Sequence, residues 1–262
     1  MKVALCIPTR KEPFPQMVEA VDRSIASIKA AGHVVGASTV AGSAYISWAA
    51  GLLVAKAMLW GADAAVLIEE DMSFGEDALL KLIETPGDVV AGNYRYKSDI
   101  VEYMGFPLLA GDAGGAYDKP ILSEGERSTM LIRKDGCIVG KSAPAGFLKI
   151  TRQCVERFRR AYPDAICDDT RQGTEFTDLF KHGGHNGVWY GQDFAFCRRW
   201  RDCGETVWIQ PDLDISHWIK KDDGTYVEYA GNYRKHLIEK HGVEFDRIQA
   251  ELIAREGQRS AA

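Results

Sequence analysis

Short apolar runs alternate with amphipathic segments through the first hundred residues. Residues 2–7 and 64–68 are almost entirely apolar, which is typical of strands buried on both faces of a parallel sheet. Apolar residues recur at helical spacing over 16–31, and a second apolar-rich helix is expected over 44–60. With a further strand expected at 33–40, the order is β-α-β-α-β. This order predicts an α/β fold with a mostly parallel, doubly wound central sheet flanked by helices.

The rest of the chain is less regular but continues to alternate strands with helices. Further strands are expected at 88–91, 128–133, 137–140, 145–150 and 206–209. Further helices are expected at 76–84, 152–161 and 230–256, and from residue 192 up to Gly204. The glycine-rich run 110–115 lacks the strand and helix that surround a nucleotide-binding fingerprint, so it is interpreted as a loop. No linker divides the chain into independent domains.

Three carboxylates, Glu69-Glu70-Asp71, directly follow the apolar run 64–68. Open α/β sheets bind their ligands at the carboxyl ends of the strands, which is where this triplet is expected. Glu69 and Asp71 point to the same side if the backbone is extended, and they then repel each other unless a cation lies between them. Mg²⁺ or Mn²⁺ is the natural partner and would bring substrate phosphates with it. A solvated acidic turn is the alternative interpretation.

The composition mainly excludes classes of protein. The 262 residues are 46% hydrophobic and 26% charged, as expected of a soluble globular chain, and no apolar stretch is long enough to span a membrane. The N-terminus reaches Pro8 too early for a signal peptide, and the six cysteines show no C-x-x-C spacing. We therefore expect free thiols and a cytoplasmic location. The net charge of −5 argues against non-specific nucleic-acid binding by the whole surface but leaves room for a local basic patch.

Polar residues after two other strands are further candidates. Arg95 and Lys97 follow the strand at 88–91 and carry donors suited to a diphosphate, although surface cations in a loop would give the same pattern. His217 follows the strand at 206–209 and can ligate a metal. A structural histidine whose hydrogen bonds are satisfied is the alternative.

In their order, these features resemble the GT-A fold nucleotide-sugar glycosyltransferases, particularly the small family-2-like enzymes of bacteria and phages. The resemblance covers about residues 2–218 and rests on five segments: Pro8-Thr9-Arg10, Glu69-Glu70-Asp71 as a D-x-D-like triplet, Gly146-Phe147, Gly191-Gln192-Asp193 and the late His217. It implies one GT-A-like domain over residues 1–218, with a nucleotide-binding half to about 97 and an acceptor half over about 98–218. Residues 219–262 then form a C-terminal helical extension.

The resemblance also implies roles for the matching residues. The metal ligands would be Asp71, Glu69 and His217, for Mn²⁺ or Mg²⁺. The donor-binding residues would be Pro8, Thr9, Arg10, Glu69, Glu70, Arg95 and Lys97. The acceptor side would comprise Gly146, Trp189, Tyr190 and Gln192. Asp193 matches the acid that deprotonates the acceptor in inverting members, so we expect inversion.

Two positions depart from the family pattern. Glu69 replaces the usual first Asp of the triplet, which lengthens its reach and bears on metal preference. Gln192 replaces the Glu that usually precedes the catalytic Asp, which removes one charge beside the base.

The implied activity is transfer of a sugar from a nucleoside-diphosphate sugar to a hydroxyl acceptor. The phage-type resemblance raises DNA with a hydroxymethylated pyrimidine as one acceptor class, in which case the enzyme would act in the host cytoplasm. The arginines that could line a phosphate-tracking face are Arg152, Arg157, Arg159, Arg160, Arg198, Arg199 and Arg201. Trp189 and Tyr190 could stack on a flipped base. A solvated charged face, or arginines paired with acidic neighbours, is the alternative, and a saccharide, lipid or protein acceptor stays open.

Two further function classes also stay open. One is a nucleotidyltransferase with a similar sheet, although the Gly-rich, Lys-ending signature expected near residue 10 is missing. The other is a non-catalytic sugar- or nucleotide-binding module with a degenerate site, which the departures at Glu69 and Gln192 leave open.

Overall fold

The computed structural model of the chain describes residues 1–109, 130–170 and 173–260. A central sheet of eight strands runs through this part of the chain. In spatial order the strands are β2 (Val34–Ala41), β1 (Lys2–Thr9), β3 (Ala64–Ile68), β8 (Phe147–Thr151), β5 (Val89–Gly92), β13 (Val207–Gln210), β7 (Ile138–Ser142) and β6 (Phe106–Pro107). β1 is parallel to both β2 and β3, and β5 is parallel to β13. β8 is antiparallel to β3 and to β5, so those two strands point the same way. The predicted α/β fold with a mostly parallel sheet is confirmed.

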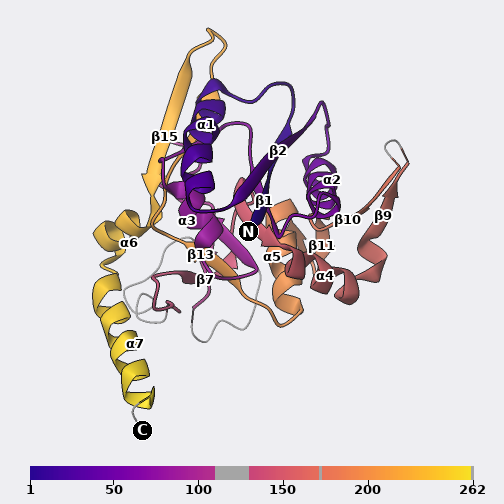
Figure 1. Cartoon of the computed structure of the whole chain (residues 1–262). Helices are drawn as coiled ribbons and strands as arrows, with labels where there is room; N and C mark the ends of the chain where they lie inside the picture. The colour runs from indigo at the N-terminus through magenta and orange to yellow at the C-terminus, as the bar shows by residue number, and fades with distance from the viewer. Residues whose placement is uncertain (110–129, 171–172, 261–262) are drawn as a thin grey trace.

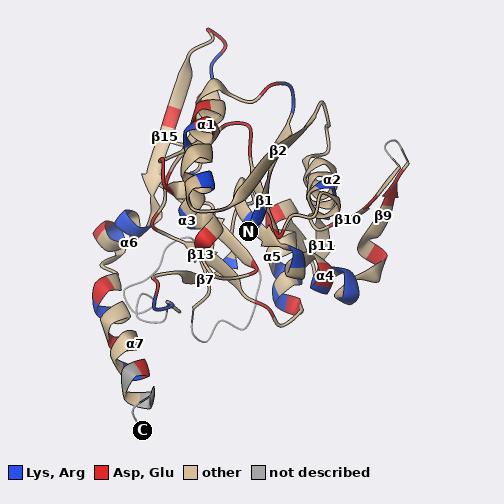
Figure 2. Ribbon diagram, in the orientation of Figure 1, with Lys and Arg blue, Asp and Glu red and all other residues tan. Residues whose placement is uncertain are grey.

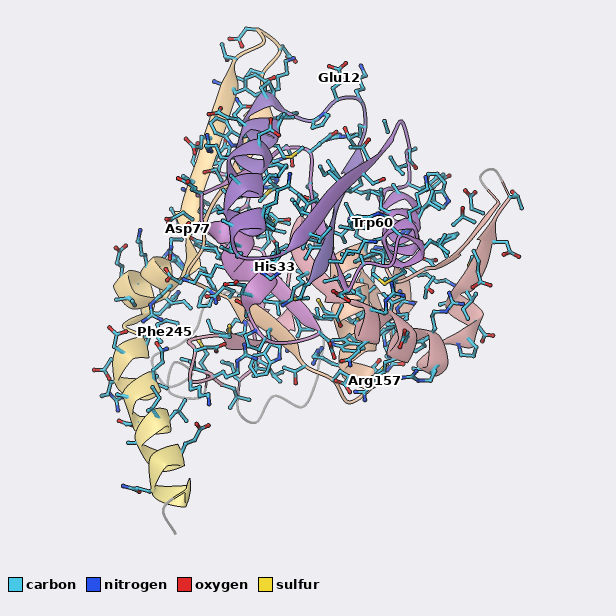
Figure 3. The ribbon with its side chains drawn as sticks, in the orientation of Figure 1. Glu12, His33, Trp60, Asp77, Arg157 and Phe245 are labelled. Carbon is cyan, nitrogen blue, oxygen red and sulfur yellow. The ribbon has the colours of Figure 1, made fainter. Side chains whose placement is uncertain are left out.

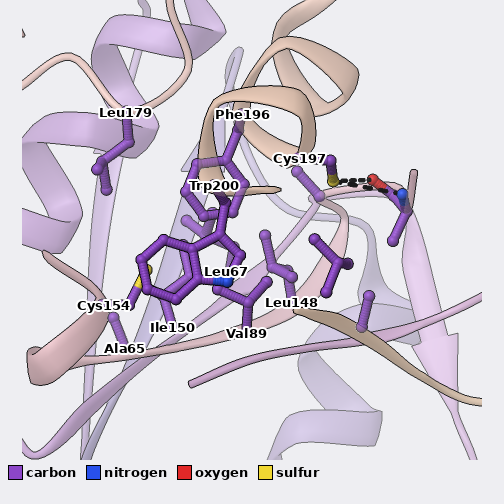
Figure 4. Packing of buried hydrophobic residues seen from close by; sticks show 14 of the residues in the cluster. Ala65, Leu67, Val89, Leu148, Ile150, Cys154, Leu179, Phe196, Cys197 and Trp200 are labelled. Carbon is purple, nitrogen blue, oxygen red and sulfur yellow. Dashed lines mark hydrogen bonds between the residues drawn. The ribbon is translucent and has the colours of Figure 1, made fainter. Parts of the chain in front are cut away.

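Helices cover both faces of this sheet (Figure 1). α1 (Pro15–Ala30) and α3 (Ala78–Glu84) pack on one face, and α2 (Ile46–Leu59), α4 (Arg152–Ala161) and α5 (Gln192–Asp202) pack on the other. Side chains of a strand point alternately to opposite faces, so β3 supplies Ala65 and Leu67 to one core and Val66 and Ile68 to the other. Figure 4 shows the first of these cores, in which the fully buried Trp200 of α5 packs near Leu67. Burial on both faces explains why the strands lack polar alternation.

Smaller sheets and short elements complete the described part of the chain. β4 (Met72–Phe74), β14 (Asp214–Lys220) and β15 (Tyr226–Asn232) form an antiparallel sheet in the order β15-β14-β4. Two outlying hairpins pair β9 (Ile166–Asp169) with β10 (Thr174–Thr177) and β11 (Gly183–His185) with β12 (Val188–Tyr190). A 3₁₀-helix, η2 (Pro163–Ala165), leads into β9. No helix among the described residues has the length and apolar content needed to cross a membrane.

The C-terminal region differs from the single helix expected at 230–256. Its first residues belong to β15, and two helices follow, α6 (Tyr233–His241) and α7 (Phe245–Ser260). The Asn232 side chain caps α6 by accepting a hydrogen bond from the Lys235 N–H, and Gly242 ends α6 at a φ of 63°. α7 extends away from the sheet towards the C-terminus (Figure 1). Because charged residues occur throughout this segment, its sequence did not indicate β15 or the end of α6 at Gly242.

The hairpin expected around Asp135-Gly136 is present only in part. The Gly136 N–H donates to the Arg133 carbonyl, and Ile132 bridges Ile138 across the turn. The start of the first strand, at 128–129, and the loop expected at 110–115 lie outside the described residues.

Lys149 in the middle of β8 is buried, although lysines rarely are, and its ammonium donates to the backbone carbonyls of Ile83 and Thr85. Burial lowers its pKa to about 8 from the ordinary 10.5. The unfolded chain therefore binds one more proton than the folded chain between these two pH values, so this residue makes stability rise with pH there.

We expect Lys149→Met to remove that rise. Urea unfolding at pH 8 and pH 10 measures it. As the pH rises, the unfolding free energy of the wild type should increase relative to that of the variant by about 1.4 kcal/mol per pH unit. Parallel pH dependence of the two proteins would contradict a neutralised Lys149.

Candidate functional site

The acidic triplet lies where the sequence predicts, at the carboxyl edge of the central sheet. Glu69 to Asp71 connect β3 of the central sheet to β4 of the smaller sheet. The backbone here is not extended, because the Met72 N–H donates to the Glu69 carbonyl and closes a tight turn. The prediction that Glu69 and Asp71 point to the same side because the backbone is extended is therefore wrong about the backbone. The turn nevertheless brings both carboxylates into one cluster.

Glu69, Asp71 and His217 each offer one ligand atom, and these atoms all lie within 4.8 Å of one another. His217 joins the cluster because β14 pairs antiparallel with β4, which sets His217 opposite Met72. Its Nδ1 lies 3.1 Å from the Arg95 carbonyl oxygen, which can only accept a hydrogen bond. Nδ1 therefore donates to that carbonyl, and Nε2 faces Asp71, whose Oδ1 is 3.6 Å away. A backbone partner on the remote nitrogen is the usual way in which a ligating histidine is oriented.

The surroundings shift the pKa values of the two carboxylates of the cluster in opposite directions. Burial, and then the charges of Asp71 and Asp193, raise the pKa of Glu69 to about 7. Burial would also raise the pKa of Asp71, but the neighbouring His217 and Lys97 outweigh it and hold that pKa below its ordinary value. The ammonium of Lys97 contacts Asp71 Oδ2 directly. Near neutral pH Asp71 is therefore ionised, whereas Glu69 still carries its proton in part of the molecules, and a cation could displace that proton.

A cavity of about 600 Å³ opens beside this cluster. Its walls come from the segments at the ends of β1, β2, β3 and β5, the start of α2 and the middle of β14. The lining residues are Pro8, Thr9, Arg10, Gly42, Ser43, Ala44, Ile46, Ala49, Glu69, Glu70, Asp71, Lys97 and His217. The volume lies within the range usual for small-molecule and cofactor sites, about 300–1,000 Å³. Most of the donor-binding and metal-binding residues expected from the sequence therefore share one cavity.

Glu70 serves a different purpose from its two neighbours. Its carboxylate accepts hydrogen bonds from the Thr9 hydroxyl at 2.5 Å, the Arg10 N–H at 2.7 Å and Arg10 Nε at 3.0 Å. These contacts tie the end of β1 to the end of β3. Glu70 therefore shapes the wall of the cavity and leaves Glu69 and Asp71 to face the cation position.

Gly146 directly precedes β8 and lies against Glu69. A Cβ atom there would lie 2.6 Å from Glu69 Oε2 and would also clash with the Tyr94 hydroxyl. The Gly146 N–H donates to the Tyr94 oxygen at 3.1 Å, and the Tyr94 hydroxyl in turn donates to Glu69 Oε2 at 3.3 Å. The absence of a side chain at Gly146 thus allows the fully buried Tyr94 to hold the Glu69 carboxylate. The sequence indicated Gly146 as a site residue but not this reason, and it did not indicate Tyr94.

Asp193 lies in the first turn of α5, whose N-cap is Gly191. Burial raises its pKa, while hydrogen bonds from backbone N–H groups, including those of Ala145 and Phe194, act in the opposite direction. The charge of Asp193 contributes to the raised pKa of Glu69. Asp193 does not line the 600 Å³ cavity. It therefore acts on the cluster from outside this cavity.

Besides Gly146 and Asp193, four expected site residues lie outside this cavity. The Arg95 guanidinium donates to the carbonyls of Ser98 and Ala230, so it braces β15 and is not positioned for a diphosphate. Trp189, on β12, is 66% exposed. Tyr190 of the same strand lies beneath the Arg198 guanidinium, and Gln192 is the first residue of α5.

The arginines considered for a phosphate-tracking face are largely engaged within the protein. Arg152 donates to the carbonyls of Met58 and Ala62, and the buried Arg199 donates to those of residues 178 and 179. Acidic partners are Glu205 for Arg157, Glu175 for Arg159 and Asp202 for Arg198. Basic and acidic residues accordingly lie next to each other on α4 and α5 (Figure 2), and Figure 3 labels Arg157 at the surface. These contacts favour the interpretation of paired arginines over a phosphate footprint.

Residues 42–46 were not indicated by the sequence as part of the site. Gly42, Ser43, Ala44 and Ile46 line the cavity because β2 is parallel to β1 and ends at the same edge. The signal was available in the predicted strand order, since the loop after any strand of a parallel sheet emerges at its carboxyl edge.

We expect His217→Ala to weaken Mn²⁺ binding by about 10-fold or more, because loss of metal-site groups commonly costs that much. Titration calorimetry on the folded protein measures this. His33→Ala is the matched control, since His33 precedes β2 at the opposite edge of the sheet. A lower melting temperature with unchanged Mn²⁺ affinity would show that His217 is purely structural.

Comparison with known proteins adds no assignment to this geometry. No family model matches the chain, and no curated protein matches it.

Proposed function

We propose that the protein is a metal-dependent glycosyltransferase that moves a sugar from a nucleoside-diphosphate sugar to a hydroxyl acceptor. The observation that carries this proposal is the convergence of Glu69, Asp71 and His217 at the wall of the 600 Å³ cavity. Two carboxylate oxygens and an oriented imidazole nitrogen form a donor set that suits Mn²⁺, and the imidazole favours it over Mg²⁺. The resemblance to GT-A fold enzymes supports the same assignment.

The charges of the site support a substrate with phosphates. The charges of Asp71 and Asp193 both act on Glu69, and within the described residues the only Lys or Arg in ion-pair contact with any of these three carboxylates is Lys97, on Asp71. This excess of acid favours a divalent cation, which when bound would neutralise the charge that grows on a departing diphosphate. Lys97 and Arg10 line the same cavity and can donate hydrogen bonds to phosphate oxygens. Thr9 and Pro8 form the wall that would hold the nucleoside.

Asp193 is the group we assign as the base. Burial raises its pKa, which makes it a stronger base than an ordinary Asp, and it reaches the cluster from outside the donor cavity. A base on the face opposite the leaving diphosphate fits inversion at the sugar carbon. The paired arginines lend no electrostatic support to DNA as acceptor, so we favour a saccharide, lipid or protein hydroxyl over a hydroxymethylated base.

We also propose a cytoplasmic location. The cysteines are all free, and Cys6, Cys137, Cys154 and Cys197 are buried. Free thiols in every position fit a reducing compartment.

Product analysis tests the proposed reaction. The protein is incubated with Mn²⁺, a panel of nucleotide sugars and a panel of acceptors, including a short duplex that carries a hydroxymethyl base. Release of free nucleoside diphosphate with sugar on the acceptor is the expected result. Release of pyrophosphate would instead indicate a nucleotidyltransferase. A rise in melting temperature with nucleotide sugar and Mn²⁺, without any product, would indicate a non-catalytic binding module.

A further inference from the structure

Lys97 occupies the place that a cation would take on Asp71. Its ammonium contacts Oδ2 of Asp71, while Oδ1 of the same carboxylate faces His217 Nε2. Both oxygens of the buried Asp71 are therefore engaged, one of them by a positive charge. A divalent cation that binds this carboxylate must compete with the ammonium for it.

The backbone that carries Lys97 is held in place, whereas its side chain is only partly enclosed. It follows β5 through a segment in which the Asn93 side chain pairs with both polar backbone groups of Gly105 and Tyr94 is buried. The Lys97 side chain is 27% exposed and lines the cavity. A lysine carries its charge on a flexible four-carbon stem, so the ammonium can leave Asp71 without movement of the backbone.

We infer that Lys97 is an exchangeable counter-ion that links the metal site to the diphosphate site. Without ligands, Lys97 neutralises Asp71. When a divalent cation takes Asp71, the displaced ammonium turns into the cavity, where a diphosphate offers it new oxygen partners. This inference rests on the proposed function, because it names the coupling between the two ligands of that same site.

The exchange predicts opposite effects of one substitution. Lys97→Met keeps an unbranched side chain one atom shorter and removes the competing charge, so Mn²⁺ alone should bind more tightly. The expected gain is about 10- to 100-fold, the range for one charge-assisted hydrogen bond that no longer opposes binding. The same variant should lose part of the increase in Mn²⁺ affinity that a diphosphate produces, because no ammonium remains to gain phosphate partners. A residue that merely supported the fold would not move these two quantities in opposite directions.

The experiment is a titration of the full chain with Mn²⁺, alone and with inorganic pyrophosphate as the diphosphate probe, corrected for the manganese that pyrophosphate binds in solution. Lys11→Met is the matched control, since Lys11 is exposed, follows Arg10 and changes the net charge equally. Lys97→Arg keeps the positive charge and should restore weak Mn²⁺ binding.

The outcomes separate the inference from the function on which it rests. Tighter Mn²⁺ binding by Lys97→Met, a smaller effect of pyrophosphate and unchanged behaviour of Lys11→Met would support the exchange. If the wild type binds both probes but Lys97→Met binds Mn²⁺ no more tightly, the exchange is overturned and the metal site stands. If neither protein binds Mn²⁺ under any condition, both the exchange and the metal-dependent function are overturned.

Discussion

Asp71→Asn should abolish Mn²⁺ binding and reduce sugar transfer by about 10²- to 10³-fold, the loss typical when one strong electrostatic contact to a developing charge is removed. Asp71 is 6% exposed and stands between Lys97 and His217, so it is the centre of the cluster. An amide keeps the shape of the side chain but offers a cation neither charge nor a second oxygen. The loss should appear in metal affinity first and in turnover as its consequence.

Calorimetric titration with Mn²⁺ and a product assay on the same preparation test this expectation. Asp77→Asn is the matched control, because Asp77 lies six residues further along, is exposed and makes no capping hydrogen bond to α3. Retention of the wild-type melting temperature would show that the variant is folded. Full transfer activity of Asp71→Asn in the presence of a chelator would exclude the metal role.

The central sheet could be predicted closely because its signals are local. The run 64–68 is β3 to the residue, and the helix expected at 152–161 is α4, with Thr151 as its predicted N-cap. Unbroken apolar runs and capping residues act over a few positions, so one sequence suffices to find them. The same holds for the position of the acidic triplet, since it follows directly from the end of a buried strand.

The arrangement within the site depends on contacts between distant segments, and the sequence contains no local signal for these. His217 reaches Asp71 only through the register of β14 against β4. Tyr94 reaches Glu69 only because Gly146 leaves room for it. Arg95 and Lys97 are two residues apart and look equivalent in sequence, but one braces β15 and the other contacts Asp71. Residue type predicted the chemistry available at this edge, and tertiary pairing decided which side chains share it.

The Asp193→Asn variant should test the base, and its expected effect is as large as that of Asp71→Asn but of a different kind. Transfer should fall by about 10²- to 10⁴-fold, the usual contribution of a positioned general base. Mn²⁺ binding should weaken far less than in Asp71→Asn, because Asp193 adds charge near Glu69 but is not one of the three residues that offer a ligand atom, and nucleoside diphosphate binding should be retained because Asp193 does not line the donor cavity. Asp202→Asn, an exposed position at the end of the same helix, is the control.

The pH profile distinguishes a base from a structural carboxylate. A general base must be ionised, so activity should fall as the pH drops through the pKa of Asp193, which burial raises above the ordinary value for Asp. The residual activity of Asp193→Asn should lack this acid limb, whereas a variant that only loosened the fold would keep it. Glu69, with a pKa of about 7, also becomes protonated as the pH falls, but saturating Mn²⁺ should displace its proton and remove its contribution to the profile. Persistence of the acid limb in Asp193→Asn at saturating Mn²⁺ would therefore assign the base to another group and leave the donor site as proposed.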